Sequence, residues 1–213
     1  MLARSYSFCY LILFAILCFA CSSGSNENST SPPLPILGER YVEEGQDTVF
    51  HTIADFSLLN QMGDTLHRAD VLGKVYVADF FFTSCPTICP VMKKEMLRVY
   101  EQFKTSPDFR ILSHSIDPKH DTVEVLKDYA EKLGVLDAST WHFLTGDQEQ
   151  LFELGQTSYL TTAMEDQQEP GGFLHSGAFL LVDQQGRIRG VYDGTKSDQV
   201  DRLLADIPKL LKP

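Results

Sequence analysis

Apolar residues form several short, almost unbroken runs along the chain. Runs rich in β-branched and aromatic residues are typical of strands buried on both faces of a sheet. They lie at Lys74–Phe82 (KVYVADFFF), Phe109–Ile116 and Trp141–Leu144. Two further stretches have the pattern of hairpins, because a polar, glycine-containing turn separates two strand-like segments. These hairpins are predicted over His51–Leu66 and Ala178–Tyr192.

Between these strands, apolar residues recur every three or four positions, which predicts amphipathic helices. Asp121 has the form of an N-cap, with a glutamate three residues later, and Gly134 marks the end of that helix. Pro208 is expected to break the last turns of the final helix. The predicted helices are Pro86–Phe103, Asp121–Leu133, Asp147–Leu154 and Ser197–Leu211.

The order of these elements predicts the fold class. Three strands are followed by three alternating helix–strand pairs, and a last hairpin strand precedes the terminal helix. Alternation of strands and helices favours parallel crossovers, whereas hairpins add antiparallel strands at the outside. We therefore expect an α/β, thioredoxin-like fold: a central mixed sheet flanked by helices, with an added hairpin.

The N-terminal segment has the composition of an export signal. Phe8–Ala20 is an apolar run of secretory length, short for a membrane span, and it stands directly before Cys21. A small residue followed by cysteine and a polar stretch resembles a bacterial lipoprotein signal with Cys21 as the lipidated residue. The alternatives are an uncleaved anchor helix and, least favoured, a cytosolic helix. The predicted organisation is a lipoprotein-type signal segment (1–20), a flexible tether (21–46) and a thioredoxin-like domain (47–213). The domain would then be exported, membrane-tethered and periplasm-facing.

Composition narrows the function. The chain has 213 residues and a net charge of −11, from 18 Lys+Arg against 29 Asp+Glu. An acidic surface repels phosphate backbones, which argues against a nucleic-acid partner. The predicted domain contains two of the five cysteines, so it is not a disulfide scaffold and its apolar core must stabilise it. P-loop, G-x-S-x-G and H-E-x-x-H motifs are absent from the sequence.

The two cysteines of the predicted domain lie where the first buried strand turns into a helix. Cys85 and Cys89 are four residues apart, so in a helical turn they share one face, with Cα atoms roughly 6 Å apart. A helix N-terminus stabilises thiolates, so a lowered pKa is expected for both. The pair is compatible with a disulfide or with shared coordination of one soft ion. Two buried structural cysteines are the less favoured alternative.

His175 is the candidate third ligand. It lies in a glycine-containing loop (GGFLHS) that enters the second hairpin, and in a thioredoxin fold that loop approaches the cysteines. Thiolates and imidazole bind Cu(I) or Zn²⁺, and three protein ligands leave a position open for transfer to a partner. Taken alone, His175 would be a surface histidine. Met92 and Met96 are expected in the core, and the remaining histidines are expected to be structural or superficial: His51, His67, His114, His120 and His142.

Several blocks of the sequence together resemble the SCO/SenC family of copper-binding, thioredoxin-fold proteins. The blocks run in the family's order from about Phe50 to Leu211: FTSCPTICP, SIDPKHDT, WHFLTG, HS and YDGT. The resemblance implies that Cys85, Cys89 and His175 are copper ligands. Many relatives have an acidic residue just before the histidine, where this chain has Leu174, so the partner that orients the imidazole is expected elsewhere.

The resemblance also implies a function. It is that of a copper metallochaperone, which delivers Cu(I) or Cu(II) to the dinuclear copper centre of cytochrome c oxidase. The partner would be the oxidase's copper-bearing subunit or another copper protein. The alternative is a thiol–disulfide reductase that acts on partner cysteines through Cys85 and Cys89, the redox-active pair. A peroxidase-like relative is a third, minor hypothesis. Copper ligation requires His175, whereas dithiol exchange does not.

Overall fold

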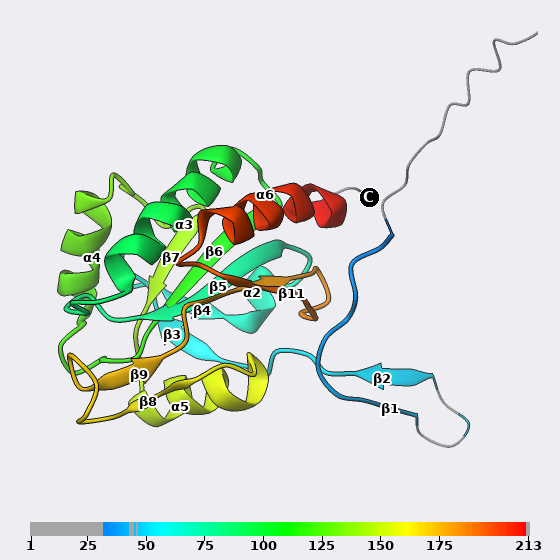
Figure 1. Cartoon of the computed structure of the whole chain (residues 1–213), viewed down its shortest axis with the longest axis horizontal. Coiled ribbons are helices and arrows are strands. Elements are labelled where there is room, and N and C mark those ends of the chain that lie inside the picture. The colour runs from blue at the N-terminus through cyan, green and yellow to red at the C-terminus, as the bar shows by residue number, and fades with distance from the viewer. Residues whose placement is uncertain (1–31, 43–44, 46, 212–213) are drawn as a thin grey trace, which may run out of the picture. The chain divides into compact units, whose positions relative to one another are not determined.

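Strand β5 (Val75–Phe81) lies at the centre of the sheet, and every one of its residues is buried. It pairs in parallel with β6 (Phe109–Ser115), which pairs in parallel with β7 (Trp141–Leu144). On its other side β5 pairs antiparallel with β10 (Ala178–Val182), which pairs antiparallel with β11 (Ile188–Asp193). The five-stranded order is therefore β11-β10-β5-β6-β7, and the predicted α/β class with a central mixed sheet is confirmed (Figure 1).

The computed structural model describes residues 32–42, 45 and 47–211. The other elements are β1 (Arg40–Val42), β2 (Thr48–Phe50), β3 (Ser57–Leu59), β4 (Thr65–His67), α2 (Arg68–Val71), α3 (Cys89–Phe103), α4 (Val123–Lys132), α5 (Gln148–Glu153), the π-helical turn η1 (Leu154–Ser158), β8 (Ala163–Glu165), β9 (Phe173–His175) and α6 (Ser197–Leu211). Among the described helices, none is long and apolar enough to cross a membrane.

Successive residues of β5 face opposite sides of the sheet, and different elements cover the two sides. Phe81 contacts Lys93 of α3 and Tyr129 of α4 on one side. Phe80 contacts Tyr159, just after η1, on the other side. Helices α3 and α6 run side by side over the sheet (Figure 1). The apolar run of β5 is thus explained by helices and a loop segment on both faces.

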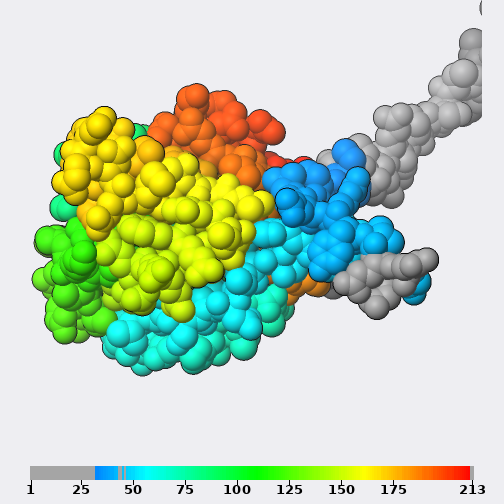
Figure 2. Space-filling model, turned by 90° about the horizontal axis from the view of Figure 1, so that it is seen from below, coloured from blue at the N-terminus to red at the C-terminus, as the bar shows by residue number. Residues whose placement is uncertain are grey.

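Both predicted hairpins are present, but the first is shorter than predicted. Its strands are β3 and β4, so the predicted strand from His51 contributes only Ser57–Leu59. Leu59 also forms an isolated antiparallel bridge with Thr145. In the space-filling view, the cyan surface of this hairpin adjoins the yellow surface around α5 (Figure 2). The second hairpin, β10–β11, has the predicted bounds to within a residue.

Three predicted details of the helices are wrong. Helix α3 begins at Cys89 rather than Pro86, because a helix starting at Pro86 would need an N–H from Pro90 to bond the Pro86 carbonyl, and proline has none. The N-cap of α4 is Thr122, whose hydroxyl accepts from the N–H of Val125, rather than Asp121. Helix α6 continues through Pro208 to Leu211. The short hairpins β1–β2 and β8–β9, helix α2 and the π-helical turn η1 were not predicted.

The chain joins the domain earlier than the predicted boundary at residue 47. Leu34 and Leu37 pack against the core, and the Leu37 N–H donates to the carbonyl of Ile188 at 2.8 Å. The Arg189 guanidinium donates to the carbonyl of Pro35 at 2.9 Å. These residues fall within the predicted tether, so part of 21–46 belongs to the domain. The predicted signal segment 1–20 and Cys21 lie outside the described residues.

Candidate metal centre

The two cysteines of the domain lie on either side of a helix start. Cys85 is in the loop after β5, where its N–H donates to the carbonyl of Phe82 at 3.2 Å. Cys89 is the first residue of α3. Both side chains are free thiols, and their residues are 7% and 2% exposed. The loop, rather than a helical turn as predicted, therefore brings the two sulfurs to the same place.

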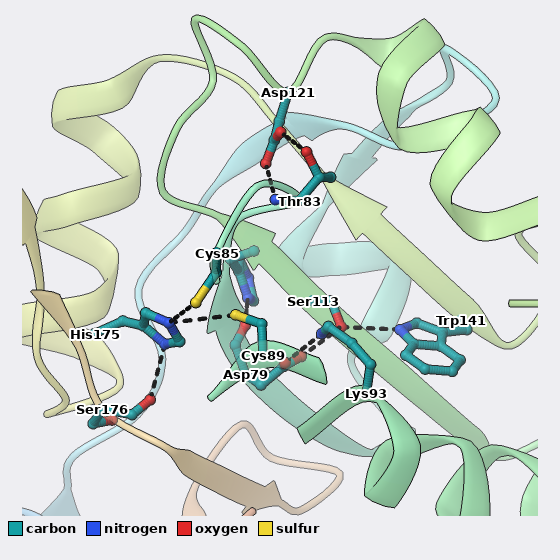
Figure 3. Close-up of polar contacts among 11 residues, drawn as sticks. Asp79, Thr83, Cys85, Cys89, Lys93, Ser113, Asp121, Trp141, His175 and Ser176 are labelled. Atoms are coloured by element: carbon teal, nitrogen blue, oxygen red, sulfur yellow. Dashed lines mark hydrogen bonds and ion pairs between the residues drawn. The ribbon is translucent and has the colours of Figure 1, made fainter. Parts of the chain in front are cut away.

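His175, the last residue of β9, lies beside both cysteines although it is 86 residues after Cys89 in the sequence. Its Nε2 lies 3.7 Å from Cys85 Sγ and 3.4 Å from Cys89 Sγ. One donor atom from each of the three residues lies within 4.8 Å of the others (Figure 3). The prediction that the fold brings these three residues together is confirmed. Soft sulfurs and one imidazole nitrogen form a donor set suited to Cu(I) or Zn²⁺.

The imidazole is oriented from its other nitrogen. Nδ1 of His175 lies within hydrogen-bond distance of the backbone carbonyl oxygen of Ser176, at 3.2 Å. This bond turns Nε2 toward the sulfurs, as a backbone carbonyl commonly does for a metal-binding histidine. The orienting partner is therefore a carbonyl on the following residue, in a chain that has Leu174 before the histidine. The edge of the imidazole also packs against Phe82, with ring centroids 5.7 Å apart.

The two thiols have opposite pKa shifts. Burial alone would raise the pKa of Cys85, but hydrogen bonds with His175 and Thr87 outweigh it and lower the pKa to about 6. Burial raises the pKa of Cys89 to about 12, and the positive charge of Lys93 offsets only part of this rise. The expectation that both pKa values are lowered is thus wrong for Cys89. Desolvation at its buried position outweighs the effect of the helix N-terminus.

Asp121 anchors the loop that carries Cys85. Its buried carboxylate accepts hydrogen bonds from the Thr83 N–H at 3.0 Å and from the Ser115 hydroxyl at 2.6 Å, and it also accepts from the Thr83 hydroxyl. Thr83 is two residues before Cys85 (Figure 3). This role was not predicted, because the sequence around Asp121 fits a helix N-cap. The one signal for it is that Asp121 falls in the SIDPKHDT block that carries the family resemblance.

The other tempting residues lie outside the cysteine–histidine group. Met92 and Met96 are fully buried in the core, as expected. Asp117 forms a turn in which its carbonyl accepts from the N–H groups of His120 and Asp121. The remaining histidines are superficial or structural, as expected: His67 and His120 are exposed, His51 bonds the carbonyl of Ser158, and His114 and His142 are buried.

One feature beside the cysteines was not predicted. A pocket of about 320 Å³ is lined by both cysteines and by Lys93, among others. Lys93 is 2% exposed and forms an ion pair with Asp79, a fully buried residue in the middle of β5. The sequence pattern placed Asp79 within an apolar run and Lys93 on a helix, and neither position alone indicates a pair.

The fold and this site define a thioredoxin-like α/β protein with a buried Cys–Cys–His group. A family model described as SCO1/SenC matches residues 44–212. The chain belongs to the SCO1/SenC family.

Solved structures agree with this assignment. A SCO1/SenC family lipoprotein from Bacillus anthracis str. Ames is 30% identical, with 76% of this chain and 96% of that chain covered and a TM-score of 0.69. BsSco is described as a Sco-family cytochrome c oxidase assembly protein with a disulfide switch. It is 30% identical over 76% of this chain and 95% of its own, with a TM-score of 0.63. Arabidopsis thaliana ScoI with copper bound shares the fold at 22% identity, covering 73% and 98% of the two chains with a TM-score of 0.60.

Proposed function

We propose that this protein is a copper metallochaperone. The observation that carries the proposal is the approach of Cys85 Sγ, Cys89 Sγ and His175 Nε2 to within 4.8 Å of one another. Two sulfurs and an imidazole suit Cu(I), and they also accept Cu(II). Three protein donors leave one position of a tetrahedral ion open, so a partner ligand can enter before the protein ligands leave.

The proposed target is the dinuclear copper centre of cytochrome c oxidase, on the oxidase's copper-bearing subunit. Two comparisons support this proposal. BsSco is described as a cytochrome c oxidase assembly protein, and the Arabidopsis relative of the same fold was solved with copper bound. The acidic chain, with a net charge of −11, is also compatible with a cationic cargo.

Copper stoichiometry tests the site. We expect the reduced, full-length chain to bind one copper ion, and His175→Ala to lower the affinity at least tenfold, because a ligand is lost. His67→Asn is the matched control, since it removes an exposed imidazole outside the site. Unchanged copper affinity in the His175 variant would remove this site from consideration. Transfer is then followed from the loaded chain to the purified, copper-free oxidase subunit.

A thiol–disulfide reductase is the second candidate, favoured by the difference between the two thiols. Cys85, with a pKa of about 6, is largely thiolate at neutral pH and can attack a partner disulfide. Cys89 stays protonated until the mixed disulfide must be resolved. Exchange with an oxidised partner should survive His175→Ala better than copper binding does. A rate equal to that of a free thiol would argue against this candidate.

We further propose that the chain is exported and tethered. Residues 1–20 would act as a lipoprotein-type signal, Cys21 would carry the lipid, and the following residues would link it to the domain. The Bacillus anthracis relative is described as a lipoprotein, which supports the proposal. Mass spectrometry of the mature N-terminus is the test: a diacylglyceryl group on Cys21 is expected, and an unprocessed Met1 would support the uncleaved anchor instead.

A further inference from the structure

Thr161 joins the end of the π-helical turn η1 to the strand that carries His175. It lies two residues before β8, and its N–H donates to the carbonyl of Gly155 in η1 at 2.9 Å. Its hydroxyl forms a hydrogen bond with the hydroxyl of Ser176, the residue directly after His175. The side chain of Thr161 therefore connects η1 to the end of β9, next to the imidazole.

The backbone around Ser176 is held on both sides of this contact. The Ser176 N–H donates to the carbonyl of Thr162 at 3.2 Å. One residue further on, the carbonyl of Gly177 accepts from the N–H of Gly194, in the YDGT block, at 2.7 Å. The hydroxyl contact lies between these two backbone bonds, so Ser176 is fixed through its N–H, through its side chain and through the residue that follows it.

Ser176 in turn directs the imidazole of His175. Its carbonyl oxygen lies 3.2 Å from Nδ1 of the ring, while Nε2 lies 3.4 Å from Cys89 Sγ and 3.7 Å from Cys85 Sγ (Figure 3). Because the peptide group is planar, the direction of this carbonyl is set by the backbone on either side of it. A turn of the Ser176 peptide would therefore move the contact that orients the ring.

The chain adopts an unfavourable backbone conformation directly before Thr161. Leu160 has a φ of 54°, in the left-handed region that leucine rarely adopts. Its side chain is 50% exposed, so burial of that side chain offsets little of the cost. Such conformations persist where the surrounding contacts fix them, and they are frequent at functional sites. At this position the surrounding contacts are those of Thr161 with Gly155 and Ser176.

We propose that Thr161 is a positioning residue for the metal centre: its hydroxyl fixes Ser176, and Ser176 directs the imidazole of His175 toward the two sulfurs. The inference rests on the proposed copper function and deepens it, because it names a residue outside the donor group that controls the third ligand. The contacts involved join hydroxyl and peptide groups, which do not ionise near neutral pH.

The position of the ring is measured first, in the full-length, reduced chain without metal. Isotope-labelled histidine allows the nuclear Overhauser contact between the rings of His175 and Phe82, whose centroids are 5.7 Å apart, to be followed by NMR. Thr161→Val removes the hydroxyl at nearly constant volume, and we expect loss of this contact. Thr161→Ser keeps the hydroxyl and should retain it. Thr157→Val is the matched control, since the exposed Thr157 hydroxyl bonds only within its own turn, to the carbonyl of Glu153.

Copper affinity then tests whether the position of the ring matters for binding. Loss of a group that orients a metal-binding histidine commonly lowers the affinity about 10–100-fold. Thr161 acts through Ser176, so we expect the lower end, about a tenfold loss of Cu(I) affinity in Thr161→Val. Thr161→Ser should restore the affinity. Ser176→Ala removes the other hydroxyl of the pair and keeps the carbonyl, and it should reproduce the loss.

A double-mutant cycle separates positioning from a general structural effect. In the His175→Ala background, Thr161→Val should cause no further loss of affinity, because the hydroxyl acts through that ring. A structural role would lower the affinity by the same factor in both backgrounds, and that result would overturn the inference. An NMR ring contact retained in both Thr161→Val and Ser176→Ala would also overturn it, and so would an unchanged copper affinity in a variant that has lost this contact.

Failure of the proposed function gives a different result. In that case His175→Ala itself leaves the copper affinity unchanged, whereas the ring contact of the metal-free chain still shows whether Thr161 positions the imidazole.

Discussion

Replacing His175 should change the acidity of Cys85, and the structure sets the size of the change. Burial raises the pKa of this thiol, and the hydrogen bond with His175 is the largest contribution that lowers it, ahead of Thr87. The result is a pKa of about 6 against an ordinary 9.0. His175→Ala removes the largest contribution that lowers the pKa of Cys85, while the burial that raises it remains. We expect the pKa to rise by about two pH units, which lowers the thiolate fraction at pH 7 about tenfold.

The assay is the rate of iodoacetamide labelling between pH 5 and pH 9, resolved by peptide mass spectrometry on the reduced, metal-free chain. Cys89 provides an internal control, because its pKa of about 12 should keep it unlabelled throughout this range. Thr87→Val should raise the midpoint for Cys85 by less than His175→Ala does, since its contribution is smaller. A midpoint that stays near pH 6 after His175→Ala would refute the argument that the imidazole lowers this pKa.

Three further predictions concern stability. Burial lowers the pKa of His114 to about 4, so the unfolded chain binds a proton that the folded chain excludes between about pH 6.5 and pH 4. Stability should fall by up to about 3 kcal/mol as the pH drops through that window, and His114→Leu should flatten this dependence in urea titrations. Gly171→Ala should lower stability by about 2 kcal/mol in urea titrations, because φ is +91° and a Cβ would lie 2.8 Å from the Phe82 ring; a neutral result would show that the loop adapts. Asp121→Ala should cost about 3 kcal/mol in the same assay, since it removes the acceptor of the buried Ser115 hydroxyl and of the half-buried Thr83 N–H, and a loss below 1 kcal/mol would contradict this.

The apolar pattern predicted the sheet well, because strands buried on both faces leave an unbroken signal. Trp141–Leu144 forms the predicted strand, and Lys74–Phe82 forms β5 with one residue fewer at each end. The pattern failed where pairing is short and exposed. Strands β1 and β8 have three residues each and are largely exposed, so they carry no periodic signal. Their existence depends on partners that only the fold supplies.

The predicted N-cap and the predicted start of the first long helix were wrong, because both rested on local sequence rules alone. Asp121 has the sequence context of an N-cap, but the loop before Cys85 uses its carboxylate, and Thr122 caps the helix instead. Pro86 suits a first helical turn, yet Pro90 delays the helix to Cys89. Sequence spacing thus predicted that the two cysteines lie close together, as they do, but it misplaced the element that holds Cys85.

The approach of the three side chains was predictable, but the difference between the two sulfurs was not. Spacing placed Cys85 and Cys89 together, and the loop motif added His175 from the other end of the domain. Their acidities depend on burial and on Thr87 and Lys93, which only the folded chain brings to the sulfurs. The burial of each sulfur depends on all the side chains packed around it, so it cannot be predicted from a motif of a few residues.

This difference assigns the two sulfurs separate parts in any exchange with a partner. Cys85 lies in a loop and holds the more acidic thiol, so under the proposed function a partner thiol, disulfide or metal ligand would meet it first. Cys89 lies deeper, at the start of α3, and its thiol gives up a proton only when a strong electrophile, either a metal ion or the mixed disulfide, reaches it. Copper delivery and disulfide reduction would then share the same first contact, at Cys85. They would differ in the last step, because release of copper also requires dissociation from His175, whereas disulfide exchange involves the two sulfurs alone.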